Sequence, residues 1–474
     1  MVEDHRRRIY ILPARELSPE IIAVTFAKTS RSPLSFKQIA AELSAEESAR
    51  FHEKWVVGYG HRSVAEHAVL HVAFENISRL AVECIESNRL ASYTEKSTRY
   101  QTWDLDAYHV PDEVIGMRYE DVYRSTCDHL IVCYRRSLDP VASLVRERFP
   151  RASDESEQAW DSRIRSRYID VCRYLLPAAA LSNVGMTVNA RSLANAIRKM
   201  LSHRLEEVRQ IGRMVKDVAQ HEVPTLLKYL QPVSYWQHMD SDLREQVGNL
   251  EAQPQEHALS LFSHDPEGEH HVLAAALFEH ASCLYDDAFS RVQKLDQEGR
   301  RRLAEALLGK MDRFDAPARS LEHTNYTFAA RMDQGAYFEL KRHRMMTQTP
   351  QQLTDGSGYA VPRLIAEAQI EDEYRQAMKT ASHAYQDLAS WNPHVAAYVI
   401  PNAFNRQVLM TLNLRQAFHF CELRSQPNAH FSIRRIALKM AEMIREVHPM
   451  LGSFMRLPEA ADWRSVEAEH FCQV

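Results

Sequence analysis

The chain of 474 residues carries 58 basic and 63 acidic side chains, a formal net charge of −5, and 45% of its residues are hydrophobic. This length predicts two domains of roughly 200 residues each, and the scarcity of glycine, 13 residues in all, favours a helix-rich fold. Charges of both signs are interspersed and no apolar run approaches the ~18 residues of a membrane span, which argues against a polybasic nucleic-acid surface and against a membrane protein. We therefore expect a cytoplasmic protein that binds neither nucleic acid nor membranes.

Leader and metal motifs are missing from the sequence. The opening MVEDHRRRIY is basic, but no apolar segment follows it, which argues against a signal peptide. The seven cysteines are an odd number without a CxxC pair, and the 23 histidines are scattered without an HExxH pattern. We predict reduced thiols and no metal site.

In chain order, the first half begins with a helix and a loop, and the alternating stretch AVLHVAF at 68–74 then predicts a strand. The run ISRLAVECI at 77–85 has helical periodicity and ends at the turn Ser87-Asn88-Arg89, which a polar loop and several long helices follow. Residues 238–271 are polar and hold two prolines and two glycines, so they are the best linker, with a boundary near residue 250. In the second half, NYTFAARM at 325–332 predicts the equivalent strand, ahead of a helix that ends at an Arg-His-Arg turn.

The two halves are copies of one another. The segment LLPAAALSNVGMTVNARS at 175–192 reappears as VIPNAFNRQVLMTLNLRQ at 399–416, so that a proline, an asparagine and an arginine each recur 224 positions later: Pro177 and Pro401, Asn189 and Asn413, Arg191 and Arg415. Upstream, a Glu-His pair recurs at an offset of 256 and the arginine turn at an offset of 255. We predict a tandem duplication with domains at 1–245 and 255–474, each of the α+β class, that form a pseudo-dimer.

Three blocks of the first copy resemble the flavin-dependent (alternative) thymidylate synthases, whose signature is Arg-His-Arg, seven residues, then Ser. These blocks are GHRSVAEHAVLH, SNRLASYTEKSTRY and RYLLPAAALSNVGMTVNARSLAN, in the family's order. The resemblance covers most of residues 15–235 and, more weakly, 270–460. It implies two helix-rich domains of the thymidylate-synthase-complementing type, and a homodimer resembling the family's tetramer.

The resemblance also implies an activity. A flavoprotein methyltransferase of nucleotide biosynthesis would hold FAD, take a one-carbon unit from methylenetetrahydrofolate, and use NAD(P)H as reductant. The one-carbon unit is transferred to C5 of a uracil nucleotide, most simply dUMP, and reduced to give dTMP. In such enzymes the cofactors carry the chemistry, and the protein supplies orientation and charge.

Carried over one at a time, the family's nucleotide residues are divided between the copies. The first copy keeps the sugar and phosphate residues: Glu95, Ser97, Arg99 and Arg173. It has lost the first Arg and the His of the signature, at Ser87 and Asn88. The second copy keeps the signature at Arg342, His343 and Arg344, together with Arg424 where the family has an arginine thought to polarise the pyrimidine. There the phosphate set is lost, at Pro350, Gln352, Thr354 and Ala397.

This division suggests one composite nucleotide site that uses one wall from each copy, with the reciprocal site abandoned. A dianionic phosphate needs charge-assisted, preferably bidentate donors, which the surviving arginines supply. The resemblance gives catalytic roles to Arg424, His61 and Arg342. Glu339 stands where the family has Gln, three residues before the signature, and is expected to affect recognition of the base or sugar.

For the flavin, the resemblance points to residues of both copies. The first copy supplies Ser30, His61, Ser63, Asn189, Arg191 and Asn195, and the second supplies Arg342, His343, Arg344, Met345, Asn413 and Arg415. In the second copy the position of His61 is Pro317, and that of Asn195 is His419. Arg191 also has a purely structural interpretation, in which it closes a helix C-terminus or pairs with Glu206.

Two alternatives to thymidylate synthesis remain. The phosphate residues do not specify the base or sugar, so the chain could methylate another pyrimidine nucleotide. It could also be a non-catalytic flavin or nucleotide sensor, an interpretation that the lost family residues at Asn88, Pro317 and Gln352 support. The complementary survival of arginines across the two copies favours the enzyme, because a sensor needs no such set.

Overall fold

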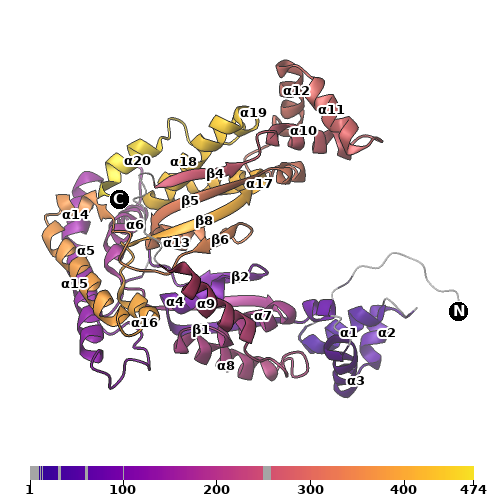
Figure 1. Ribbon diagram of the computed structural model, residues 1–474, viewed down its shortest axis with the longest axis horizontal. Helices are drawn as coiled ribbons and strands as arrows, with labels where there is room; N and C mark the ends of the chain where they lie inside the picture. The colour runs from indigo at the N-terminus through magenta and orange to yellow at the C-terminus, as the bar shows by residue number, and fades with distance from the viewer. Residues whose placement is uncertain are drawn as a thin grey trace. The chain divides into compact units, whose positions relative to one another are not determined.

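The computed structural model describes residues 10, 12, 14–29, 32, 34–58, 62–99, 101–248 and 258–474 (Figure 1). The chain divides into two compact units. The first comprises residues 1–96, 111–115 and 181–251, and the second comprises residues 97–110, 116–180 and 252–474. No helix in the described part of the chain combines the length and the apolar character needed to cross a membrane.

The first unit is built on a three-stranded antiparallel sheet of order β1-β3-β2, from β1 (Val69–Ser78), β3 (Leu181–Asn189) and β2 (Ala91–Glu95). Its helical segments are α1 (Pro19–Thr29), α2 (Phe36–Glu42), α3 (Ala45–Phe51), η1 (His52–Gly58), η2 (Arg62–His67), α4 (Arg79–Glu86), α7 (Ala190–Leu201), α8 (Glu206–Gln220) and α9 (Ser234–Val247). Helix α7 is strongly amphipathic and packs on α8 through a buried stripe that includes Leu193, Ile197 and Met200.

The second unit contains a four-stranded antiparallel sheet of order β4-β5-β8-β6, from β4 (Leu259–His264), β5 (Asn325–Asp333), β8 (Asn405–Asn413) and β6 (Thr347–Pro350). A short ribbon joins β7 (Val361–Pro362) to β9 (Phe471–Gln473). The core contains Phe328 and Met410 of this sheet, Phe418 of the helix after β8, and Ile436 and Met440 of the next helix.

The helical segments of the second unit come from both copies. They are α5 (Glu120–Arg148), α6 (Glu157–Cys172), η3 (Arg173–Leu175), α10 (Gly268–Glu279), α11 (Tyr285–Lys294), α12 (Gln297–Leu308), η4 (Arg319–His323), α13 (Gln334–Leu340), α14 (Arg363–Glu367), α15 (Glu371–Ala389), α16 (Pro393–Ala396), η5 (Ala397–Val399), α17 (Leu414–Arg424), α18 (Phe431–Val447), α19 (Pro449–Gly452) and α20 (Trp463–His470).

The two sheets have the same strand register up to a bulge in β1 after Phe74, which confirms the predicted duplication and the α+β class. Val69 pairs with Asn189 in the first unit, and Asn325 pairs with Asn413 in the second, at the sequence offsets of 256 and 224. The third strands match as well, because Ser92 pairs with Thr187 and Thr347 pairs with Thr411. Strand β4 is an addition of the second sheet.

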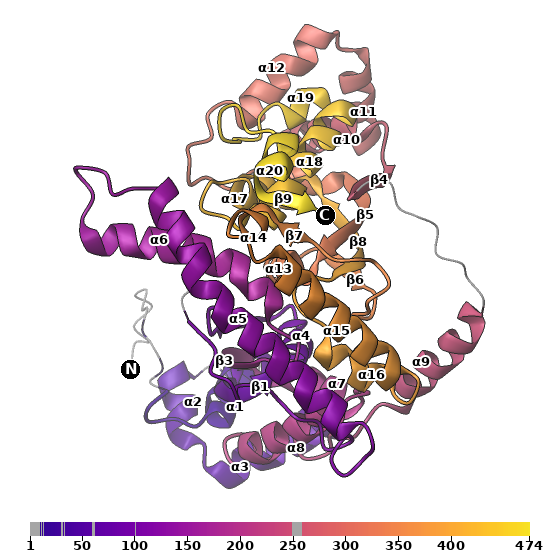
Figure 2. The ribbon, with the colours of Figure 1, turned by 90° about the vertical axis from the view of Figure 1, so that its left-hand side faces the viewer.

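The compact units do not coincide with the two sequence copies. Residues 97–110 and 116–180 belong to the first copy but lie in the second unit. Helix α5 of this segment lies beside α15 of the second copy (Figure 2). As a result, Arg99 and Arg173 share a compact unit with Arg342 and Arg424.

Two details of the sequence interpretation differ from the structure. The sequence pattern predicts no strand in the repeated segments, but their central parts are the strands β3 and β8. In β3 the buried residues Val184, Met186 and Val188 alternate with less buried ones. The linker is shorter than predicted, because α9 continues to Val247 and β4 begins at Leu259. Most of the residues between them lie outside the described part of the chain.

Candidate functional site

Six ionisable side chains from both copies form one cluster in the second unit. The first copy contributes Arg99 from the segment after β2, Asp170 from the last turn of α6 and Arg173 from the start of η3. The second copy contributes Glu339 from α13, Arg342 from the turn after it and Arg424 from the end of α17. Helix ends and turns therefore position the charged groups of the cluster, including Glu339 in the last turn of α13.

Arg99 is fixed by three hydrogen bonds. Its Nε and Nη2 donate to the two carboxylate oxygens of Asp170, at 2.9 and 2.7 Å, and its Nη1 donates to the backbone oxygen of Asn428 at 3.1 Å. This bidentate pairing is the strongest geometry available to an arginine and a carboxylate. Ser97 accepts from the backbone N–H of Arg99 at 3.2 Å, which orders the preceding turn.

Arg173 has an unoccupied hydrogen-bonding edge. It is 5% exposed, and its Nη1 donates to Thr98 Oγ1 at 2.9 Å. Its Nε and Nη2 are buried and find no hydrogen-bond partner among the described residues, since Asp170 Oδ1 is 3.6 Å from Nε. These two nitrogens form the edge of a guanidinium that binds a carboxylate or phosphate bidentately. Buried donors without a partner are costly, so this edge is a candidate site for an anion.

The side chains that the second copy contributes to the cluster are linked to one another. Arg424 donates through Nη1 to Glu339 Oε2 at 2.6 Å and through Nε to His343 Nε2 at 2.9 Å. Arg342 Nη2 lies 4.0 Å from the other oxygen of Glu339. Because His343 accepts at Nε2, its proton is on Nδ1 and the ring is neutral. Burial and the charge of Arg424 lower the pKa of His343 to about 3, which agrees with this neutral state.

Charges from both copies act on the same carboxylates. Burial alone would raise the pKa of Glu339, but the positive charges of Arg342 and Arg424, then Arg173 and Arg99, outweigh it and hold the pKa below its usual value. Burial raises the pKa of Asp170 in spite of Arg173 and Arg99. Within the cluster itself, four guanidinium groups lie near two carboxylates, which is an excess of two positive charges.

The remaining predicted nucleotide residue, Glu95, lies in the first unit. Its carboxylate pairs with Arg79, and each of these side chains is only 4% exposed. The turn of the first copy that corresponds to Arg342-His343 contains Ser87, whose hydroxyl accepts a hydrogen bond from Lys199 Nζ at 2.6 Å. This turn therefore lacks the charged set that surrounds Arg424.

The predicted flavin residues of β3–α7 and β8–α17 occupy equivalent places in the two copies. Asn189 and Asn413 cap α7 and α17, accepting from the backbone N–H groups of Ser192 at 2.8 Å and Gln416 at 2.9 Å. Arg191 pairs with Glu66, and Arg415 pairs with Glu322 at 3.0 Å. The two structural roles suggested for Arg191 are wrong. Glu206 binds Arg209 and Arg213 instead, and Arg191 lies in the first turn of α7, not at a helix C-terminus.

These groups fit an anionic cofactor. Each strand–helix junction combines a helix N-terminus with an arginine that is 51% exposed at Arg191 and 36% exposed at Arg415. Asn195 and its counterpart His419 are exposed on α7 and α17, Met345 is 64% exposed, and Arg344 is partly buried. Ser63 lines a cavity of about 640 Å³ in the first unit, together with Phe26, Phe51, Trp55 and His67. Ser30 and His61 lie outside the described residues.

Sequence reasoning missed one member of the cluster, Asp170, and two residues that contact its arginines, Thr98 and Asn428. Asp170 carried one usable signal, since an acid three residues before Arg173 on a helix can reach it. Asn428 carried none, because its contribution is a backbone oxygen. Thr98 stands between two predicted residues in an otherwise polar stretch and was not singled out.

Comparison with known proteins places this arrangement in a family. The model of the family described as thymidylate synthase complementing protein matches residues 14–225 and again 260–450, which together are most of the chain. The chain belongs to the thymidylate synthase complementing protein family. The two matches correspond to the two copies, and between them they contain all six residues of the charged cluster.

Relatives within and around this family differ in length. A UPF0159 protein of Chlamydia muridarum is 29% identical over 483 residues, covering 94% of this chain and 91% of its own. A flavin-dependent thymidylate synthase of Clostridium tetani is 27% identical over 216 residues, covering 45% of this chain and 83% of its own. A solved UMP/dUMP methylase from Streptomyces cacaoi overlays 41% of this chain with 19% identity and a TM-score of 0.34, too low to bear on fold or function.

Proposed function

We propose that the chain transfers a one-carbon unit from methylenetetrahydrofolate to C5 of a uracil nucleotide, most simply dUMP, with FAD as its redox cofactor and NAD(P)H as reductant. Family membership and the flavin-dependent thymidylate synthases among the relatives support the reaction class. The observation that carries the substrate class is the free Nε and Nη2 edge of buried Arg173, inside a cluster with two positive charges in excess.

In this proposal the first copy holds the phosphate. Arg173 offers its free edge, and Arg99 adds a second guanidinium whose orientation Asp170 and Asn428 fix. Ser97 orders the turn that carries Arg99. The phosphate would bind side chains that are already oriented, so these side chains need little reorganisation on binding.

The second copy then holds the pyrimidine. Arg424 is the donor that faces the base, and His343 and Glu339 hold its guanidinium in place through Nε and Nη1. The side chain of Arg342 is 48% exposed, so it is the member of this set that a ligand can reach from solvent. Where water is excluded, the attraction between the Arg424 guanidinium and a negative charge that develops on the pyrimidine ring is stronger.

FAD supplies hydride chemistry when bound. The residues proposed to hold it are, in the first unit, Ser63 with the junction pair Asn189 and Arg191 and, in the second unit, the junction pair Asn413 and Arg415. Their exposed guanidinium groups and helix N-termini are suited to its diphosphate. His61, Ser30, Asn195, His343, Arg344 and Met345 complete the proposed set. We also propose that two chains associate, so that four domains assemble as in the family's tetramer, which light scattering tests.

The test is the absorption spectrum of the purified chain, followed by calorimetric titration with dUMP. We expect bound flavin and a dUMP affinity that deoxyuridine, which lacks the phosphate, does not reproduce. A chain that binds dUMP and flavin without turnover would instead be a sensor. A chain indifferent to dUMP and deoxyuridine alike would overturn the proposed substrate class.

One observation favours a second candidate, a methylase of another pyrimidine nucleotide. The buried Glu339 carboxylate accepts a hydrogen bond from Arg424 Nη1. A base bound here would therefore meet a carboxylate acceptor beside the guanidinium donor, whereas an arginine without Glu339 would offer donors only. Parallel titrations with UMP, dCMP and CMP decide between the candidates, because the phosphate contacts are common to all four nucleotides.

A further inference from the structure

His430 of the second copy contacts the phosphate wall, which is formed by Arg99, Asp170 and Arg173 of the first copy. His430 is the N-cap of α18, is 2% exposed, and follows Asn428, whose backbone oxygen holds Arg99, by two residues. Its Nε2 lies 3.2 Å from the backbone oxygen of Asp170, in the last turn of α6. Carbonyl groups at the end of a helix lack partners inside the helix, and His430 supplies one from the other copy.

The hydrogen bonds of the His430 ring define which nitrogen carries the proton. The backbone N–H of Ser432 donates to Nδ1 at 3.2 Å, so the proton of the neutral ring is on Nε2, which donates to Asp170. Burial and then the charge of Arg173 hold the pKa of His430 well below its usual value, which agrees with a neutral ring. His430 is therefore a fixed donor to the helix that carries Asp170.

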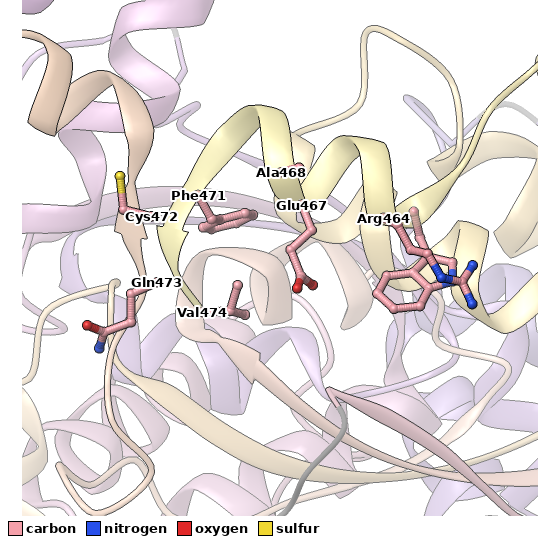
Figure 3. A pocket seen from close by; sticks show the side chains of 8 residues that line it. Arg464, Glu467, Ala468, Phe471, Cys472, Gln473 and Val474 are labelled. Carbon is pink, nitrogen blue, oxygen red and sulfur yellow. The ribbon is translucent and has the colours of Figure 1, made fainter.

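Stacked rings hold the His430 side chain in this orientation. The ring of Phe431 is stacked on it with the centroids 4.2 Å apart, and the ring of His470 is stacked on Phe431 at 4.8 Å. Phe471, the first residue after α20 (Figure 3), meets Phe431 edge-on at 5.2 Å. His470 and Phe471 come after residue 450, where the second match to the family model ends. A segment beyond that match therefore supports the contact.

His430 is also linked to the helix that carries Glu339. Ser432 Oγ donates to one carboxylate oxygen of Asp333, and the other oxygen caps α13, whose last turn holds Glu339. Asp333, Ser432 and His430 are all at most 2% exposed. A run of hydrogen bonds through buried residues thus joins the helix of Glu339 to the helix of Asp170, with His430 between them.

The reciprocal positions of the two copies lack both the histidine and the residues that it supports. Helix α8 follows α7 as α18 follows α17, and its N-cap is Leu205, whose side chain has no hydrogen-bond donor. At the repeat offsets of 255 and 224, the second copy replaces Arg99, Asp170 and Arg173 by Thr354, His394 and Ala397. The histidine and the phosphate wall are kept together in one arrangement and replaced together in the other, as a shared role predicts.

We propose that His430 is a positioning residue for the phosphate arginines. By holding the backbone of Asp170, it fixes the carboxylate that orients Arg99 and the turn that begins with Arg173. The inference rests on the proposed function, because it assigns His430 to phosphate binding without a contact to the substrate. A loss of this support should weaken the binding of ligands that carry a phosphate and spare those that do not.

Two replacements separate the contacts of His430. Asparagine keeps an acceptor for the N–H of Ser432 but is too short to reach Asp170, whereas glutamine places an amide donor near the position of Nε2 and is a poorer cap. In calorimetry on the full chain, His430→Asn should weaken dUMP binding about 3- to 10-fold, the size of one neutral hydrogen bond, and leave deoxyuridine binding unchanged. His430→Gln should melt at a lower temperature than wild type but bind dUMP about as well.

His448→Asn is the matched control. His448 is 1% exposed, and its Nε2 also lies close to a backbone oxygen, that of Asp265 at 2.8 Å, which is not part of the charged cluster. This variant should lower the melting temperature and leave the dUMP affinity unchanged. An equal loss of dUMP and deoxyuridine affinity in His430→Asn would overturn the positioning role, as would equal dUMP affinities of His430→Asn and His430→Gln.

A measurement without ligand decides the link even if wild type binds no dUMP, the result that would overturn the proposed function. The melting temperatures of His430→Asn, Arg99→Met and the chain with both substitutions form a double-mutant cycle. Because the two residues act through Asp170, the double variant should lose less than the sum of the single losses. Arg99→Met combined with His448→Asn should be additive. Additive losses in the first cycle would contradict the link.

Discussion

Arg99 and Asp170 are 71 positions apart and are joined by two parallel hydrogen bonds, and the same arginine donates to the backbone oxygen of Asn428, in the other copy. The phosphate wall is thus fastened to the second copy within one compact unit. The same chain therefore holds both walls of the proposed site, and four predictions follow from this arrangement and its charges.

Arg173→Met should weaken dUMP binding by roughly 10- to 100-fold, which corresponds to the loss of one or two hydrogen bonds to a charged group. Calorimetry measures it, with deoxyuridine as the ligand control, whose affinity should not change. Arg209→Gln is a surface control, since Arg209 belongs to an ion pair with Glu206 on α8. An equal loss for nucleotide and nucleoside would show that the variant damages the wall as a whole.

Arg99→Ala and Arg424→Ala should each abolish turnover, although they stand in different copies. Because both residues lie in the same compact unit, a mixture of the two variant proteins should stay inactive. A chain that carries both substitutions, mixed with wild type, serves as the control for subunit exchange. Recovery of activity in the first mixture would mean that the walls come from different chains.

His343 should make the protein acid-sensitive. Its pKa is about 3 in the folded chain and about 6.5 in an unfolded one, so the unfolded state takes up the proton first. The stability that depends on the neutral ring is present above pH ~6.5 and declines as the pH falls toward 3. In urea titrations across this range, His343→Gln should lose less stability than wild type. Equal slopes would show that other groups determine the acid sensitivity.

Asn413 is predicted to have two separable roles. Asn413→Ala removes the cap of α17 and should lower stability by about 1 kcal/mol. Asn413→Asp keeps a capping oxygen but adds a negative charge near Arg415, so its melting temperature should stay close to wild type while its flavin content falls. Absorbance per chain after gel filtration measures the flavin. A flavin content of Asn413→Asp equal to that of wild type would show that Asn413 caps the helix but does not bind the flavin.

Much of the fold could be predicted because the repeat carries its own alignment. Constant offsets identified Asn189 with Asn413 and Arg191 with Arg415, and in the structure each pair has equivalent capping and ion-pair contacts. The strand at 405–413 was missed, since a segment buried on alternate residues and followed directly by a helix gives a mixed period.

The grouping of the chain into compact units could not be predicted. Local periodicity indicates where α5 and α6 form but not which compact unit they join, and here they lie in the unit that holds the second copy's sheet. The partners of the predicted arginines depended on this grouping. Asp170 and Asn428 reach Arg99 only because distant segments meet, and the Asn428 contact uses a backbone atom that any residue would supply.

The shared strand register has a consequence for how the copies could diverge. The offset between the copies is 256 at β5 and 255 at β6 and falls to 224 at β8, so all but one residue of the difference lies in the helical segment between β6 and β8. Lengthening such a segment costs little, because loop closure depends only logarithmically on length. Asp170 and Arg173 belong to this segment, and the second copy has His394 and Ala397 at the same offset. One copy could therefore discard its ligand-binding groups while its sheet went on folding, which separates the loss of activity from the loss of stability after a gene duplication.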